Sequence, residues 1–186
     1  MLAIRDRTFD LSSATFGAIL CLDEDAGWRF QWSFEFEAIG REFDGRTWQP
    51  RLYAEALKLS LPTPAALTGH AVEIAEAYND DEEPNFSLYV FEHEPAYDIR
   101  IAFGPWRGGA IELKLSGKAD VNWDDGYGKA LSLRVECSAA FEGINVFDRS
   151  EESARSRLAA FYDPAAFVAE KSRIGFNYRL RQPGGG

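Results

Sequence analysis

The residues best suited to chemistry lie in one acidic stretch near the middle of the chain. No lysine or arginine occurs between Lys58 and Arg100, whereas nine acidic residues do. They are Glu73, Glu76, Asp80, Asp81, Glu82, Glu83, Glu92, Glu94 and Asp98. Consecutive carboxylates in a loop point in different directions and rarely converge on a metal ion. The run at residues 80–83 therefore predicts a solvated turn, or a docking surface for a basic partner, rather than a metal site.

Both histidines of the chain, His70 and His93, lie in the same stretch. A carboxylate beside a histidine can tune its pKa for acid–base work, which makes Glu92-His93-Glu94 a candidate for catalysis. Adjacent residues of a strand face opposite sides, however, so Glu92 and Glu94 should share a face that His93 does not. The chain also lacks the Gly-x-Ser-x-Gly, His-Glu-x-x-His, Cys-x-x-Cys and phosphate-loop patterns. We expect no catalytic residue, no metal and no cofactor.

The spacing Asp120-x-Asn122-x-Asp124 resembles the opening of a calcium-binding loop. The sixth position of such a loop should be Gly and the twelfth Glu, but this chain has Asp125 and Leu131 there. We therefore expect the three polar side chains to lie on the solvent-exposed face of a strand.

Three tryptophans, Trp48, Trp106 and Trp123, are expected near strand ends or turns, where an aromatic ring can stack on a flat ligand or cover the edge of a core. The second role is the more common. We take the following as candidate binding residues: Asp80, Asp81, Glu82, Glu83, Glu92, Glu94 and Trp106.

The distribution of charge restricts the classes of partner. The net charge is −10, but from Arg149 onward seven basic residues stand against four acidic ones. Such an anion should repel nucleic acid and anionic membrane surfaces and attract a basic protein. We expect Arg173, Arg179 and Arg181 to pair with the acidic stretch. The charged residues 5–7 stand where a secretory signal would be apolar, which favours a cytoplasmic location.

Alternation of apolar and polar residues dominates the sequence and predicts strands with one buried face. It is clearest at residues 28–37, 111–124 and 131–142, segments longer than an ordinary strand. The glycines of residues 124–128 suggest a hairpin turn between the last two. Weaker strands are expected at residues 15–23, 53–61, 71–77, 86–91, 99–103 and 174–181.

One helical segment is expected at about residues 149–172. Asp148 can cap its N-terminus, with Glu151 three residues later. Asp163-Pro164 should end this helix and start a second short one that continues through Phe167 and Val168.

These patterns predict a mostly β protein, an antiparallel β-sandwich or a strongly curved sheet of long strands, with the short helical segment and a final strand. The length favours one domain over residues 1–183, followed by a flexible glycine tail at residues 184–186. Cys21 and Cys137 lie in strand patterns and are expected to be buried thiols.

Three functions fit this sequence. The first is a non-catalytic binding protein whose acidic face, about residues 70–98, docks a basic macromolecule. The second is a β-sandwich that binds a small carbohydrate or apolar ligand between its sheets or at the strand ends. The third is a hydrolase that uses two facing carboxylates.

Overall fold

The computed structural model describes residues 1–23, 27–59, 61, 63–122 and 128–181. The protein is mostly β, with 61% of the chain in strands and 9% in helices, as the alternation predicts. None of the described helices has the length and apolar character needed to cross a membrane.

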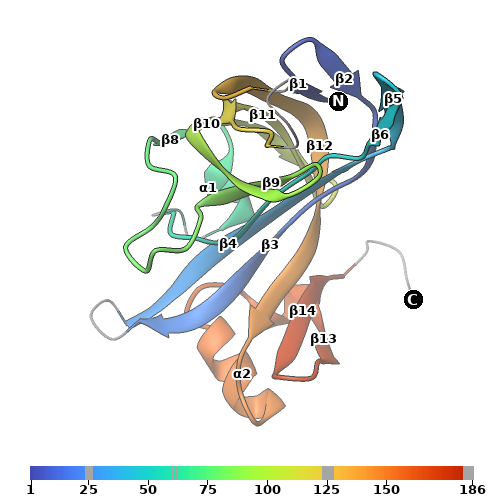
Figure 1. The fold of residues 1–186 in the computed structure, drawn as a ribbon. Helices are drawn as coiled ribbons and strands as arrows, with labels where there is room; N and C mark the ends of the chain where they lie inside the picture. The colour runs from blue at the N-terminus through green and yellow to red at the C-terminus, as the bar shows by residue number, and fades with distance from the viewer. Residues whose placement is uncertain (24–26, 60, 62, 123–127, 182–186) are drawn as a thin grey trace.

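A closed, seven-stranded barrel forms the body of the molecule (Figure 1). In order around the wall, its strands are β11 (Ala110–Ala119), β10 (His93–Arg107), β9 (Phe86–Tyr89), β7 (Arg51–Leu57), β4 (Gly27–Ala38), β3 (Leu11–Asp23) and β12 (Leu131–Val146). The long register between β11 and β12, from Ala110 opposite Ala140 to Ala119 opposite Leu131, closes the circle.

The expected curvature is therefore present, but the sheet closes on itself instead of forming two packed layers. The expectation of a purely antiparallel sheet is wrong at one pair, because β3 and β12 run parallel, with Thr15 opposite Ala140 and Leu20 opposite Val146. Alternation shows which face of a strand is buried, but neither its direction nor its neighbour is encoded in a period of two.

Smaller elements extend the barrel wall. β1 (Leu2–Ile4) pairs with β12 and with β2 (Arg7–Phe9), and β8 (Ala71–Ile74) pairs with β10. β5 (Arg41–Phe43) and β6 (Arg46–Trp48) form a separate hairpin. The one-turn helix α1 (Pro64–Leu67) is capped by the Thr63 hydroxyl and leads into β8.

The side chains predicted to face inward fill the barrel. In β4, Phe30, Trp32, Phe34 and Phe36 are at most 5% exposed, and the polar residues between them are only partly buried. β11 and β12 alternate in the same way. Trp32 donates its indole N–H to the carbonyl of Leu61 (3.0 Å), which satisfies its polar atom in the core. The expected hairpin turn and Trp123 lie outside the described residues, as does the tail.

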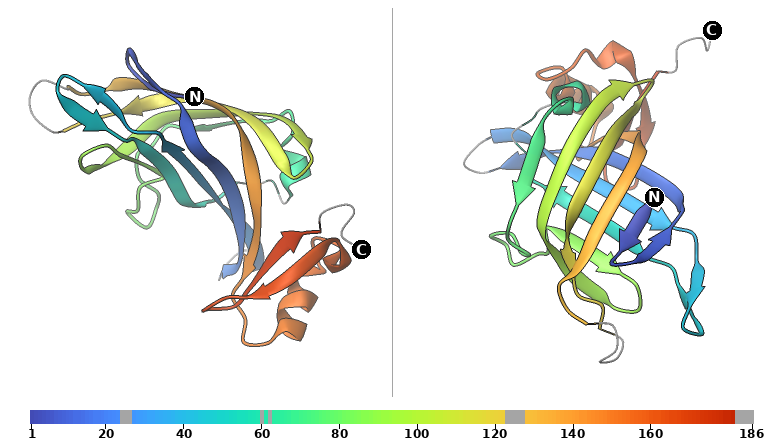
Figure 2. Two further views of the ribbon diagram at one scale, coloured as in Figure 1. Left: turned by 90° about the vertical axis from the view of Figure 1, so that its right-hand side faces the viewer. Right: turned by 90° about the horizontal axis from the view of Figure 1, so that it is seen from above.

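The C-terminal segment covers one end of the barrel (Figure 2). It consists of α2 (Glu151–Leu158), a 3₁₀ turn (Pro164–Ala166), β13 (Phe167–Lys171) and β14 (Phe176–Leu180). The expected final strand is present. The second helix is confined to the 3₁₀ turn, and Phe167 and Val168 belong to β13 instead, because pairing of Phe167 with Leu180 satisfies their backbone and buries the Phe167 ring.

The N-cap of α2 is Ser150, whose hydroxyl accepts the N–H of Ser153 at 3.2 Å, and not Asp148 as predicted. Asp148 lies just before it and accepts the N–H groups of Arg149 (2.6 Å) and Ser150 (3.4 Å).

Aromatic contacts close both ends of the barrel. At the end covered by α2, Phe30 meets Phe161 and Tyr162 at ring distances of 5.1 and 5.8 Å. At the other end, Trp48 packs against Phe91 at 5.3 Å and carries the Arg7 guanidinium over its ring at 4.2 Å. The barrel is thus a packed core rather than a hollow container.

Candidate functional site

The acidic run at residues 80–83 occupies a well-defined turn between β8 and β9. The Asn79 side-chain oxygen accepts the N–H groups of Asp81 (2.9 Å) and Glu83 (3.0 Å), and the Asn79 N–H donates to the Glu83 carbonyl (2.8 Å). Glu82 has a φ of 62°, in the left-handed region. Because Asn79 and the backbone make these bonds, the carboxylates do not hold the turn together and stay exposed in solvent.

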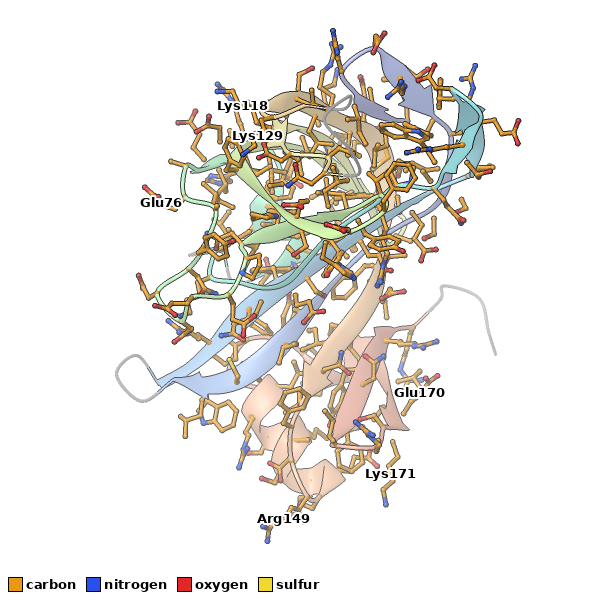
Figure 3. All side chains as sticks on the ribbon, viewed as in Figure 1. Glu76, Lys118, Lys129, Arg149, Glu170 and Lys171 are labelled. Atoms are coloured by element: carbon orange, nitrogen blue, oxygen red, sulfur yellow. The ribbon has the colours of Figure 1, made fainter. Side chains whose placement is uncertain are left out.

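Most of these carboxylates have no counter-charge. Asp81 lies 3.5 Å from the Lys58 ammonium, whereas within the described part of the chain no cation lies within ion-pair distance of Asp80, Glu82 or Glu83. Glu76, at the start of the same turn, is equally exposed (Figure 3). We call this cluster of negative charge the acidic turn (Glu76 and residues 80–83). Within the described residues, Asp81 is its one member with an ion-pair partner.

The C-terminal arginines do not neutralise the acidic turn, contrary to our expectation. Arg179 pairs with Glu170 (3.3 Å), and Arg181 donates to the carbonyl of Ala165 (2.9 Å), so both find partners within the C-terminal segment. Arg149 and Lys171 also lie there, far from Glu76 in Figure 3.

Glu92 and Glu94 are not part of the acidic turn. They flank the start of β10, at the opposite end of β9, and the four residues of β9 span about 13 Å. Glu94 accepts a hydrogen bond from the Asn122 side chain (2.8 Å), whereas Glu92 is exposed. The structure therefore divides the predicted acidic site between the two ends of one short strand.

Trp106, the remaining predicted binding residue, lies late in β10, remote from both acidic groups. Its ring is half-buried and packs edge-on against Phe16 (6.0 Å) and Phe141 (5.8 Å). Its backbone N–H donates to the Thr68 hydroxyl (3.1 Å). These contacts indicate that the Trp106 ring covers the edge of the hydrophobic core and does not form a binding site.

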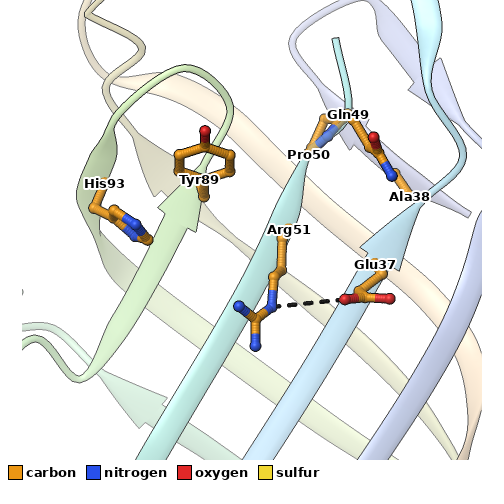
Figure 4. A pocket seen from close by; sticks show the side chains of 7 residues that line it. All are labelled: Glu37, Ala38, Gln49, Pro50, Arg51, Tyr89 and His93. Carbon is orange, nitrogen blue, oxygen red and sulfur yellow. Dashed lines mark ion pairs between the residues drawn. The ribbon is translucent and has the colours of Figure 1, made fainter.

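Between the two acidic groups, the outer wall carries a patch that sequence analysis did not select. Opposite residues of an antiparallel pair point to the same face. Glu37 lies opposite Arg51, Arg51 opposite Tyr89, and Tyr89 opposite His93. One row of side chains thus crosses four strands on the outside of the barrel (Figure 4). With Glu35 and Tyr53 from the adjacent row, we call it the polar-aromatic patch.

Ion pairs and ring contacts fix this patch. The Arg51 Nε lies 2.6 Å from Glu35 and 3.9 Å from Glu37, and its guanidinium carbon lies 4.9 Å from the centre of the Tyr53 ring. The hydrogen bond with Glu35 raises the pKa of Arg51 above its ordinary value. The Tyr53 hydroxyl is 3.1 Å from His93 Nδ1, and the Tyr89 and His93 rings are 4.8 Å apart.

The patch surrounds a shallow cavity of about 270 Å³, lined by Glu37, Ala38, Gln49, Pro50, Arg51, Tyr89 and His93 (Figure 4). Tyr89 is 38% exposed, so its ring is open to a partner. The signal that could have revealed the patch is the pair of tyrosines at outward positions of two strands, where alternation leads one to expect charged or small residues.

The residue types that bind metal ions are scattered over the described part of the chain. No group of three or more histidine, cysteine and acidic residues converges within the described ranges. Asp120, the first residue of the calcium-like spacing, instead accepts hydrogen bonds from the Ala130 N–H (2.8 Å) and the Tyr97 hydroxyl (3.2 Å).

No protein-family model, curated protein or solved structure matches this chain. The features that indicate a function are therefore the geometry of the polar-aromatic patch and of the acidic turn.

Proposed function

We propose that the chain is a non-catalytic binding protein that docks a basic protein partner on the outer wall of its barrel over β7 and β9. The main support for the proposal is the exposed Tyr89–His93 ring pair, with exposed carboxylates beyond both ends of β9. Most of these carboxylates have no ion-pair partner among the described residues.

The composition of this surface is that of a protein-binding site. Tyrosine and arginine supply much of the binding energy in protein interfaces, and the contacts around them exclude water. Arg51 is held by Glu35 and stacked on Tyr53, so little conformational freedom would be lost when a partner covers it. The acidic turn and Glu92 add long-range attraction for a basic surface, which mainly accelerates association.

The test compares two variants with the same net charge. Asp80→Asn, Glu82→Gln and Glu83→Gln together neutralise the acidic turn. Asp6→Asn, Glu112→Gln and Glu152→Gln together remove three exposed charges from other parts of the surface. Partners are captured from the native lysate, eluted with salt and identified; each is then purified and its affinity measured.

The turn variant should bind a captured basic partner at least about tenfold more weakly than the control variant. Tyr89→Ala should weaken binding by about 10- to 100-fold, with stability close to that of the wild type, because its ring lies at the surface. Equal affinities of the two charge variants for every partner would refute the proposal.

A small apolar ligand is the second candidate, favoured by one cavity at the barrel end near α2. It measures about 240 Å³ and is lined by Trp28, Arg29, Phe30, Lys58, Leu59, Leu61 and Phe161. If such a ligand binds there, a small apolar aromatic compound should quench tryptophan fluorescence in the wild type, and Phe161→Ala should change its affinity. The cavity at which three carboxylates meet (Glu35, Glu55 and Glu142) is only about 100 Å³, well below the roughly 300 Å³ of ordinary ligand pockets, and gives the hydrolase alternative little room.

A further inference from the structure

Strand β8 is an edge of the sheet that is short and carries one charged residue, Glu73, but has no lysine, proline or bulge. It pairs with β10 alone, and no other described strand lies along its second side. Figure 1 and the right-hand view of Figure 2 show it at the margin of the molecule. Natural edge strands are commonly blocked by lysine, proline or a bulge. Residues Ala71–Ile74 contain neither lysine nor proline, and their register with β10 is continuous.

The backbone groups that point outward can be assigned from one hydrogen bond. The Phe103 N–H donates to the carbonyl of His70 at 2.9 Å. In an antiparallel ladder the bonded pairs recur every second residue. This makes Val72 opposite Ile101 and Ile74 opposite Ile99 the bonded pairs. Beyond them the ladder changes phase at Asp98, which has a φ of 51° and donates its N–H to the Ala75 carbonyl (3.1 Å). Ala71 and Glu73 consequently direct their N–H and C=O groups away from β10, towards solvent.

The side chains of β8 also lack cover. Val72 and Ile74 lie opposite Ile101 and Ile99 and so face the core, yet they are only half-buried, whereas Ile99 and Ile101 are 1% exposed. Each of them packs on the barrel from one side only. A further strand beside β8 would bury their remaining apolar surface. This burial would add to the free energy of binding in proportion to the area removed from water.

The charge around this edge specifies what such a strand would be. Glu73 lies on the outer face of β8, where its exposed carboxylate is 3.5 Å from the Arg100 guanidinium. The acidic turn (Glu76 and residues 80–83) follows directly after the strand. We infer that β8 is the docking edge for an extended basic segment of the partner, which adds to the sheet as an antiparallel strand and places its cations against Glu73 and the acidic turn. This rests on the proposed function and defines its partner, because strand addition takes affinity from the backbone and specificity from side chains.

The probe is a short synthetic peptide of alternating lysine and valine, and its matched control is the same peptide with alternate backbone nitrogens methylated. Methylation keeps every charge but removes hydrogen-bond donors. The wild-type protein should bind the methylated peptide about tenfold or more weakly, because ladder bonds are lost.

Two variants at one position separate charge from backbone. Glu73→Gln and Glu73→Pro remove the same carboxylate, but only proline removes the outward N–H, and edge strands tolerate proline. Glu73→Pro should bind the unmethylated peptide about tenfold more weakly than Glu73→Gln. Amide hydrogen exchange gives a readout that does not depend on the variants folding. In the wild type, the amides of Ala71 and Glu73 should become protected when the peptide binds.

Equal binding by Glu73→Pro and Glu73→Gln, with no new protection at Ala71 and Glu73, would overturn strand addition. So would a peptide that does not bind, or one that binds equally well when methylated. The proposed function has its own test in the two charge variants, so a failure at β8 leaves it standing if the acidic turn still determines partner affinity.

Discussion

Arg157 of α2 and Trp28 of β4 are in direct contact, with the guanidinium carbon 4.2 Å from the centre of the indole ring. The same guanidinium lies 3.0 Å from Asp148, which is largely shielded from solvent. One side chain thus joins the start of the C-terminal segment to the edge of the barrel core. The C-terminal segment therefore packs on the barrel, and disrupting its packing should lower the free energy of unfolding of the protein.

The first prediction concerns that packing. Leu158, at the end of α2, is fully buried, so Leu158→Ala should lower the free energy of unfolding by about 2–5 kcal/mol. Glu152→Ala, on the exposed face of the same helix, should change it by less than about 0.5 kcal/mol. Urea unfolding followed by tryptophan fluorescence measures both. A Leu158→Ala protein as stable as the Glu152→Ala control would show that the helix does not seal the core.

The second prediction is a pH dependence. The hydrogen bond with Ser153, together with the N–H groups of Ser150 and Arg149 and the charge of Arg157, lowers the pKa of Asp148, although burial opposes this. A lowered pKa in the folded state gives stability above the ordinary aspartate pKa of about 3.9, and this stability disappears as the pH falls through the folded value.

Asp148→Asn should therefore be less stable than the wild type at pH 7, and the difference should shrink steadily below about pH 4. Asp6→Asn, which removes the same charge from an exposed turn, is the control. Thermal unfolding at a series of pH values measures the difference. A stability difference between the wild type and Asp148→Asn that stays constant down to about pH 2 would contradict a lowered pKa of Asp148.

The third prediction tests the point where β12 leaves the barrel wall. The register between β12 and β3 shifts between Phe141 and Ile144, and Gly143 lies there with a φ of 122°. A Cβ at this position would lie 2.5 Å from the Asn177 side-chain oxygen and 2.7 Å from the Tyr178 carbonyl oxygen. Gly143→Ala should cost about 2–4 kcal/mol through strain and overpacking.

Gly40→Ala is the matched control, because a Cβ there would meet nothing closer than 3.4 Å. Its effect on the free energy of unfolding should stay within about 1 kcal/mol. If the two glycine variants unfold at the same denaturant concentration, the crossing at Gly143 is not tightly constrained.

The fourth prediction concerns Cys137, which forms no disulfide. Like Cys21 it is half-buried, and not fully buried as the sequence predicts. Burial raises the pKa of the Cys137 thiol to about 11. The thiolate is the reactive form, so at pH 8 Cys137 should react with iodoacetamide at least about tenfold more slowly in the folded protein than in the unfolded chain. Mass spectrometry of digested samples resolves the two cysteines. Equal rates for Cys137 in the two states would contradict its burial.

The candidate site shows where sequence reasoning reached its limit. Residues 80–83 do form an exposed turn, because four consecutive carboxylates have no reason to be buried and Asn79 can satisfy the backbone locally. The polar-aromatic patch was not predicted, since Arg51, Tyr89 and His93 are far apart in sequence and become neighbours through strand pairing alone. Their residue types alone do not indicate a site. Only their position in one row across the strands does.

The sequence by itself determined the sidedness of the long strands. In β4, β11 and β12 the apolar residues recur with period two. Only an extended strand buries these residues on one face and exposes the polar residues to solvent on the other. Tertiary structure decided everything that depends on which strands are neighbours: closure through β11 and β12, the parallel pair of β3 with β12, and the pairing that makes Phe167 part of a strand. Period two is the same for either direction and any partner. Those choices follow from how long-range packing fills the inside of the barrel.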